Sequence, residues 1–199
     1  MREIGLDVGH EFLGENGTSN WHVATSLRNP SRVETIEGMT FDLRIHQVRH
    51  PLDAYESILR FIVPHSIFGW SLKCIFQDLG VNLRGINDSR ELAFGYWLYW
   101  NLMVEQNIRP QVRFRVEEGH YALYQLLARY FHVTPPNRIV ESHFNTGFRE
   151  KTSQRSTAKV RHDATLAKTL DSAEEFKRIS ASLRYQIRVK SHAYGYAIP

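Results

Sequence analysis

The stretch that decides the fold reads Ile45-His46-Gln47-Val48-Arg49-His50-Pro51-Leu52-Asp53-Ala54-Tyr55-Glu56-Ser57-Ile58-Leu59. Its first residues alternate as in a short strand, with His46 and Val48 on one side of the backbone. Pro51 then ends the strand, and proline fits the first turn of a helix because its missing N–H would have no partner there. Apolar residues follow at positions 52, 55, 58, 59 and 62, which is the spacing of one helical face. The stretch therefore predicts a strand, a tight turn and a helix.

The turn between this strand and this helix has the properties of an anion site. Ligands of α/β proteins bind where strands end, because helix N-termini with unpaired N–H groups gather there and favour negative charge. Arg49 adds a planar guanidinium that suits phosphate. Ser57 lies eight residues further on, about two helical turns along the helix, and its hydroxyl is placed to bind the same anion. A plain strand-to-helix connection is the alternative interpretation.

Length and composition describe a single domain. The 199 residues are enough to bury a substantial core, and 42% hydrophobic with 23% charged residues is ordinary for a soluble globular protein. No apolar run approaches the roughly 20 residues that cross a bilayer, and the first residues do not resemble a signal peptide. We therefore expect a cytoplasmic protein with no membrane partner. The net charge of +4 suits an anionic ligand.

The single cysteine, Cys74, lies among apolar residues and has no partner for an intrachain disulfide. We expect a buried, inert thiol, with a catalytic nucleophile as the alternative. The ten histidines are scattered and do not have the spacing of a zinc site. We therefore expect no metal.

The residues of the turn resemble a known family. Arg49 and Pro51 at the end of a strand, Asp53 just after them, and Ser57 resemble the 3′-phosphate-binding segment of the sulfotransferases, which use 3′-phosphoadenosine-5′-phosphosulfate (PAPS). In that family the Arg and the Ser hold the 3′-phosphate of the nucleotide, so the resemblance assigns Arg49 and Ser57 to cofactor binding. It also implies an α/β, P-loop NTPase-like sulfotransferase fold with a central, mainly parallel sheet flanked by helices.

Two further segments resemble a bacterial branch of the sulfotransferases. Gly9-His10-Glu11 is followed by a glycine-rich stretch and Ser19-Asn20-Trp21-His22, and the chain has Tyr194-Gly195-Tyr196 near its terminus. The resemblance makes Glu11 the candidate base that takes the proton of the acceptor hydroxyl, with His10 as an alternative. Both side chains could instead brace the turn.

A late basic stretch, 145–161, holds five cations between Arg149 and Arg161. Sulfotransferases close over the 3′-phosphate with a late basic loop, so the resemblance makes Asn145, Arg149 and Lys151 further cofactor-binding candidates. A solvated loop is the alternative. Nucleic-acid binding is disfavoured because no aromatic residues are interleaved to stack bases.

One feature of the family is missing from the expected place. Only eight residues precede Gly9, and they contain no Gly/Ser/Thr-rich loop for the 5′-phosphosulfate. The resemblance therefore predicts a domain without its first strand, phosphosulfate loop and first helix. The loss of each hydrogen-bond donor that stabilises charge in the transition state raises the activation free energy by on the order of 3 kcal/mol. We therefore expect very slow sulfuryl transfer to a hydroxyl or amine acceptor. Non-catalytic binding of adenosine 3′,5′-bisphosphate is the alternative, and the acceptor and the oligomeric state stay open.

The other helices and strands are predicted from the spacing of apolar residues. The sequence predicts helices over 21–27, 90–106, 121–131 and 173–191, a strand over 110–118, and an irregular loop over 64–87. The helix over 90–106 is expected to be capped by Asp88 or Ser89 and to bury an aromatic stripe. The loop over 64–87 is expected to cover the site and to select the acceptor.

Overall fold

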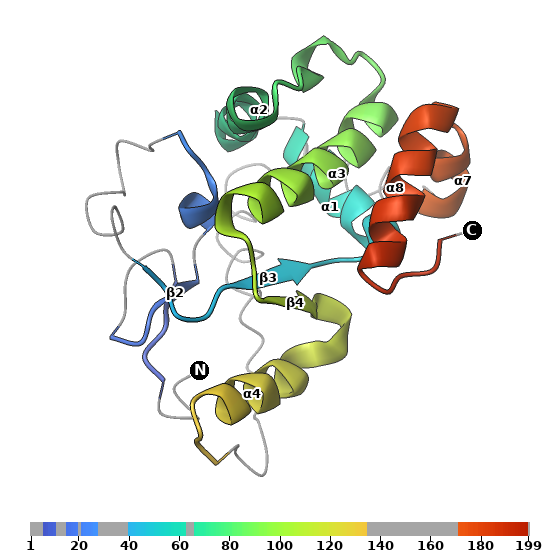
Figure 1. Ribbon diagram of the computed structural model, residues 1–199. Coiled ribbons are helices and arrows are strands. Elements are labelled where there is room, and N and C mark those ends of the chain that lie inside the picture. The colour runs from blue at the N-terminus through green and yellow to red at the C-terminus, as the bar shows by residue number, and fades with distance from the viewer. Residues whose placement is uncertain are drawn as a thin grey trace, which may run out of the picture.

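The computed structural model describes residues 6–10, 15–19, 21–27, 40–62, 66–134 and 171–198 (Figure 1). In chain order its elements are β1 (Gly9–His10), β2 (Thr18–Ser19), the 3-10 helix η2 (Trp21–Ala24), β3 (Ile45–Val48), α1 (Pro51–Ile62), α2 (Ser66–Leu79), η3 (Leu83–Gly85), α3 (Ser89–Ile108), β4 (Val112–Arg115), η4 (Val116–Glu118), α4 (Gly119–Tyr130), α7 (Ser172–Lys177) and α8 (Ala181–Ala193). Two strand pairs, β1 with β2 and β3 with β4, are parallel. Helices combined with parallel strands confirm the predicted α/β class. Each sheet has two strands within the described residues.

Helices cover both faces of the β3–β4 pair. In Figure 1, α3 and α8 lie on one side of these strands and α4 lies on the other. Successive strand residues face opposite layers: Val48 packs into the cluster with α1 and α3, whereas Phe114 packs against α4. The register pairs Val48 with Arg115, so the two strands end side by side. The residues just after each strand are therefore brought to one edge of the sheet.

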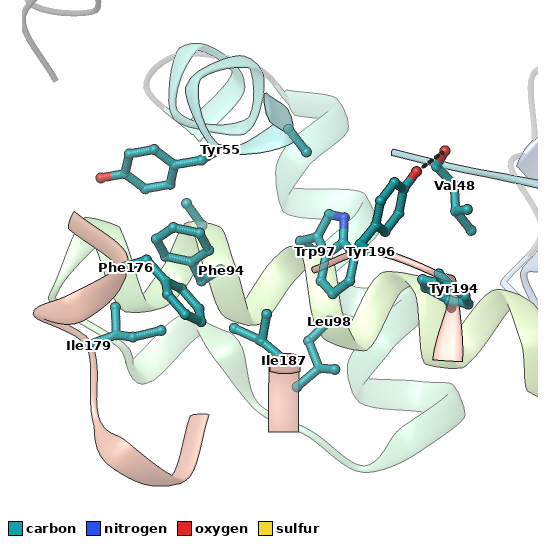
Figure 2. Close-up of a cluster of buried hydrophobic side chains, with 12 residues drawn as sticks. Val48, Tyr55, Phe94, Trp97, Leu98, Phe176, Ile179, Ile187, Tyr194 and Tyr196 are labelled. Atoms are coloured by element: carbon teal, nitrogen blue, oxygen red, sulfur yellow. Dashed lines mark hydrogen bonds between the residues drawn. The ribbon is translucent and has the colours of Figure 1, made fainter. Parts of the chain in front are cut away.

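The largest apolar cluster lies between α1, α3, α7 and α8 (Figure 2). Tyr55 stacks on Phe94 with ring centroids 4.5 Å apart, and Phe94 meets Phe176 edge-on at 5.2 Å. Aromatic pairs of this kind contribute about 0.5–1.5 kcal/mol beyond the area that they bury. The helix α1 is therefore anchored within a few residues of its N-terminus, where the predicted anion site begins.

The predicted strand, turn and helix over 45–62 are confirmed as β3 and α1, with Pro51 in the first helical turn. The helix over 90–106 is confirmed as α3, which runs to Ile108. Its cap is Asp88, whose carboxylate accepts the Arg90 N–H at 2.8 Å. Trp97 of the predicted aromatic stripe is buried, and Tyr96 and Trp100 pack against a core cluster, so the stripe is part of the core, as predicted.

The prediction of an irregular loop over 64–87 is wrong, because α2 occupies residues 66–79. Phe68, Leu72 and Ile75 recur on one helical face and are buried. Gly69 costs a helix about 1 kcal/mol relative to Ala, a loss that the burial of this face offsets. Gly80 then ends α2 with a φ of +70°. A helix packed in the core occupies the stretch where the sequence predicts a loop that selects the acceptor.

The predicted helix over 173–191 is also corrected, since it is divided into α7 and α8. Ile179 lies between them and is buried in the main cluster. The Ser180 N–H donates to Glu91 Oε1 of α3 at 2.8 Å, which replaces an intrahelical hydrogen bond. The helix is therefore divided at a residue held by a contact distant in sequence. The local periodicity of apolar residues contains no signal of such a contact.

Three shorter predictions change in extent. The strand over 110–118 is β4, which ends at Arg115 and continues as η4. The helix over 121–131 is α4, which begins at Gly119 and ends at Tyr130. The helix over 21–27 is the single 3-10 turn η2.

Cys74 is buried, as predicted, and its thiol has no reactive character. Burial, with a smaller contribution from the nearby Asp78, raises the pKa of Cys74 to about 12. The thiol is therefore protonated at neutral pH. Among the helices of the described residues, none has the length and apolar character needed to cross a membrane.

Candidate functional site

The site is the turn between β3 and α1. Arg49 follows the last residue of β3, and its Nη1 donates to Ser57 Oγ at 3.4 Å. The Arg49 side chain is exposed and Ser57 is half-buried. The structure therefore brings together the two residues that the sequence spacing pairs, with Arg49 just before α1 and Ser57 in its second turn.

His50 closes the first turn of α1. The Leu52 N–H donates to His50 Nδ1 at 3.3 Å, and the Ala54 N–H donates to the His50 carbonyl at 2.9 Å. The ring accepts at Nδ1, so the other nitrogen, Nε2, carries the proton and lies 3.3 Å from the Ala197 carbonyl. His50 therefore takes the capping role that Ser, Thr, Asp or Asn usually has.

Trp97 ties the turn to α3. Its indole Nε1–H donates to the Arg49 carbonyl at 2.9 Å, and the ring is buried. A buried indole N–H requires an acceptor, and this one fixes the backbone of Arg49 while its side chain extends to solvent. The aromatic stripe of α3 thus contributes a contact to the site as well as to the core.

Glu117 lies against the other side of the turn. Its Oε1 accepts the His50 N–H at 2.8 Å and its Oε2 accepts the Tyr196 hydroxyl at 2.6 Å. Burial opposes ionisation of Glu117, but these hydrogen bonds and the charge of Arg49 prevail and hold its pKa below the ordinary value. Glu117 is therefore a carboxylate at neutral pH.

Tyr196 belongs to the C-terminal segment that crosses the ends of β3 and β4. Its hydroxyl also lies 3.2 Å from the Val48 carbonyl, a contact that Figure 2 shows as a dashed line. Arg115 Nη1 donates to the Gly195 carbonyl at 3.1 Å, and the Arg115 guanidinium lies 5.8 Å from the centre of the Tyr196 ring. Burial and the neighbouring Glu117 raise the pKa of Tyr196, so its hydroxyl stays protonated and donates.

A partly buried ionic cluster lies where β3 and β4 meet α3 and α8. Glu105 of α3 accepts from Arg113 at 2.6 Å and from Lys190. His46 Nδ1 lies 3.8 Å from Glu105 Oε1, and the His46 ring meets Tyr194 edge-on. Burial lowers the pKa of His46 to about 4, against the opposing effect of Glu105. His46 is therefore neutral at physiological pH.

The other predicted site residues are not placed. Glu11, Asn145, Arg149 and Lys151 lie outside the described residues. The backbone of His10 is described and pairs with Ser19, but its side chain is not. These candidates stay predictions.

Three contacts of the turn are not predicted by the sequence. Its patterns indicate Trp97 only as a core residue, Glu117 only as a charge on a strand, and Tyr196 only as part of the C-terminal resemblance. The signal that could have found Glu117 is its place just past a strand able to pair with β3. Within the parts of the chain that the structure describes, no three His, Cys, Asp or Glu side chains gather as metal ligands would.

Comparison with known proteins finds no relative of this chain. No family model, no curated protein and no solved structure matches the chain. The function is therefore proposed from the residues of the turn and from the sequence resemblance that they carry.

Proposed function

We propose that the turn of Arg49 and Ser57 binds the 3′-phosphate of a phosphorylated adenosine nucleotide, and that the chain is a sulfotransferase-like protein whose nucleotide is PAPS. The observation that carries the proposal is the 3.4 Å contact between Arg49 Nη1 and Ser57 Oγ. A guanidinium and a hydroxyl in contact supply charged and neutral donors for a phosphate monoester. Arg49 is exposed, so a ligand can reach its guanidinium without unfolding the turn.

The fixed backbone of the turn favours binding. Trp97 holds the Arg49 carbonyl and His50 caps α1, so little conformational entropy is left to lose when the anion arrives. Only the long Arg49 side chain has to be ordered, and its contact with Ser57 already restricts it. This preorganisation is what distinguishes the turn from an exposed arginine on a helix.

The proposed reaction is in-line transfer of the sulfuryl group from PAPS to a hydroxyl or amine of an acceptor, within a P-loop NTPase-like fold. In this proposal Glu11 or His10 takes the acceptor proton, and Asn145, Arg149 and Lys151 close over the 3′-phosphate. The sulfur–oxygen bond to the nucleotide breaks as the bond to the acceptor forms, and adenosine 3′,5′-bisphosphate leaves. Binding without transfer is the alternative, and the β3–α1 turn serves both.

Calorimetric titration with adenosine 3′,5′-bisphosphate tests the proposal. We expect binding to the unaltered chain and a loss of at least about tenfold in affinity for the Arg49→Ala/Ser57→Ala variant, because charge-assisted hydrogen bonds contribute about 1.5–3 kcal/mol. Arg60→Ala is the matched control, since Arg60 is an exposed cation at the other end of α1 that pairs with Glu56.

Two outcomes would contradict the proposal. One is equal affinity of the Arg49→Ala/Ser57→Ala variant and the unaltered chain. The other is equal affinity of the unaltered chain for adenosine 5′-monophosphate and the bisphosphate, because the two ligands differ only in the 3′-phosphate. Release of adenosine 3′,5′-bisphosphate from PAPS in the presence of hydroxyl and amine acceptors then separates transfer from binding alone.

A further inference from the structure

We infer that Tyr196 is a positioning residue that holds the Glu117 carboxylate away from Arg49, and so keeps the guanidinium available to the anion. The inference rests on the proposed function and adds the C-terminal segment to the site. The Glu117 carboxylate lies beside a turn that is proposed to bind phosphate, although both groups are negatively charged.

The parallel pairing of β3 and β4 creates this conflict. Val48 and Arg115 are partners in register, so the residues that follow each strand become neighbours. Arg49 comes one residue after Val48, and Glu117 comes two residues after Arg115. The N–H of His50, the residue after Arg49, donates to Glu117 Oε1 at 2.8 Å, so the carboxylate lies beside the turn. An ion pair between Arg49 and Glu117 would occupy the guanidinium that the phosphate needs.

The observed contacts avoid that ion pair. Arg49 Nη1 donates to Ser57, whereas both oxygens of Glu117 are taken by neutral donors, the His50 N–H and the Tyr196 hydroxyl. The two donors lie on different segments, so together they orient the carboxylate. Without the Tyr196 hydroxyl, Glu117 Oε2 would lose its hydrogen-bond donor. The exposed guanidinium of Arg49 would then pair with that oxygen.

The Tyr196 ring is itself firmly held. It is buried, its hydroxyl also reaches the Val48 carbonyl, and it meets the His50 ring edge-on at 5.0 Å. Arg115 holds the Gly195 carbonyl that precedes it. Tyr196→Phe therefore removes the hydroxyl and leaves the ring with its packing.

The test is a cycle of three variants, Tyr196→Phe, Glu117→Gln and the double variant, titrated with adenosine 3′,5′-bisphosphate. We expect Tyr196→Phe to weaken binding by up to about fivefold, the size of effect that a competing exposed ion pair exerts. Glu117→Gln removes a negative charge beside the anion, so this variant supplies the background for comparison. In that background Tyr196→Phe should no longer weaken binding, since a neutral amide does not compete for Arg49. Tyr185→Phe is the control, because Tyr185 of α8 is 70% exposed.

A purely structural role for Tyr196 gives a different pattern. Tyr196→Phe would then weaken binding by the same factor in the Glu117→Gln background as in the unaltered chain, because no competition between Glu117 and Arg49 would be relieved. That result would overturn the inference, as would unchanged binding by Tyr196→Phe. Thermal unfolding of each variant shows that the compared proteins are folded.

A measurement without nucleotide separates this inference from the proposed function. Modification of Arg49 by phenylglyoxal, followed by mass spectrometry, reports whether the guanidinium is paired. We expect slower modification in Tyr196→Phe and recovery in the double variant. Equal rates in all variants would overturn the inference even if the nucleotide binds, whereas the expected rates without nucleotide binding would defeat only the proposed function.

Discussion

His46 is 5% exposed at the meeting point of β3 and α3, and Glu105, Arg113 and Lys190 surround it. Its pKa in the folded chain, about 4, is below the ordinary value of 6.5. The unfolded chain therefore binds more protons between these two values, and stability falls as the pH is lowered from about 6.5 toward 4. At about 1.4 kcal/mol per pKa unit, protonation of His46 over this whole pH range lowers the free energy of unfolding by about 3 kcal/mol.

Urea unfolding at a series of pH values checks this prediction, with His46→Gln as the comparison. Between pH 6.5 and 5 the unaltered chain should lose stability faster than the variant does. Glu105, the carboxylate beside His46, titrates below this range, because its pKa is below the ordinary value of 4.5. Equal slopes for the two proteins would show that His46 is not the group responsible.

Asp88 makes a second prediction at the scale of single residues. Its carboxylate accepts the N–H of Arg90, whereas Ser89, the alternative cap in the sequence, is the first residue inside α3. Asp88→Ala should therefore destabilise the chain by about 1 kcal/mol, and Ser89→Ala should cost much less. Chemical denaturation measures both, and Asp88→Asn should retain most of the capping. A larger loss in Ser89→Ala would contradict the assignment of the cap.

Among the elements, α2 escapes prediction because its aromatic residues and Gly69 resemble a loop in composition. Its buried face nevertheless follows the helical period, and Ile75 is 0% exposed while the adjacent Phe76 is 57% exposed. Ile75→Ala should therefore cost about 2–5 kcal/mol of unfolding free energy. Phe76→Ala should change it by about 0.5 kcal/mol or less. Similar losses in the two variants would contradict the burial of this face.

Elements with a strong local signal are predictable from the sequence, whereas long-range pairing is not. Arg49 and Ser57 are eight residues apart on one turn and one helix, so periodicity is sufficient to bring them together. Glu117 joins them only through the pairing of β3 with β4, and the division of α7 from α8 depends on Glu91 of α3. Such contacts depend on how distant elements pack, which a window of local sequence does not contain.

At the scale of the whole molecule, the C-terminal segment closes the chain on its central sheet. Tyr196 reaches the Val48 carbonyl across a separation of 148 residues, and Tyr194 packs beside Trp97 with ring centroids 6.1 Å apart. Between the two tyrosines, Gly195 has a φ of +79°, a conformation that a residue with a side chain adopts only with strain. The glycine therefore lets both rings point into the core from one turn of backbone.

Gly195→Ala tests whether this crossing stabilises the whole fold. The added Cβ would lie 3.3 Å from Arg115 Nη1, the atom that holds the Gly195 carbonyl, so backbone strain and crowding act together. We expect a loss of about 1–2 kcal/mol in unfolding free energy. Gly85→Ala is the matched control, because its φ is not in the left-handed range and no atom lies within 4 Å of the new Cβ. Equal stability of Gly195→Ala and Gly85→Ala would mean that the C-terminal segment contributes little to the fold, whereas a selective loss would show that the packing of this segment on the end of β3 stabilises the fold.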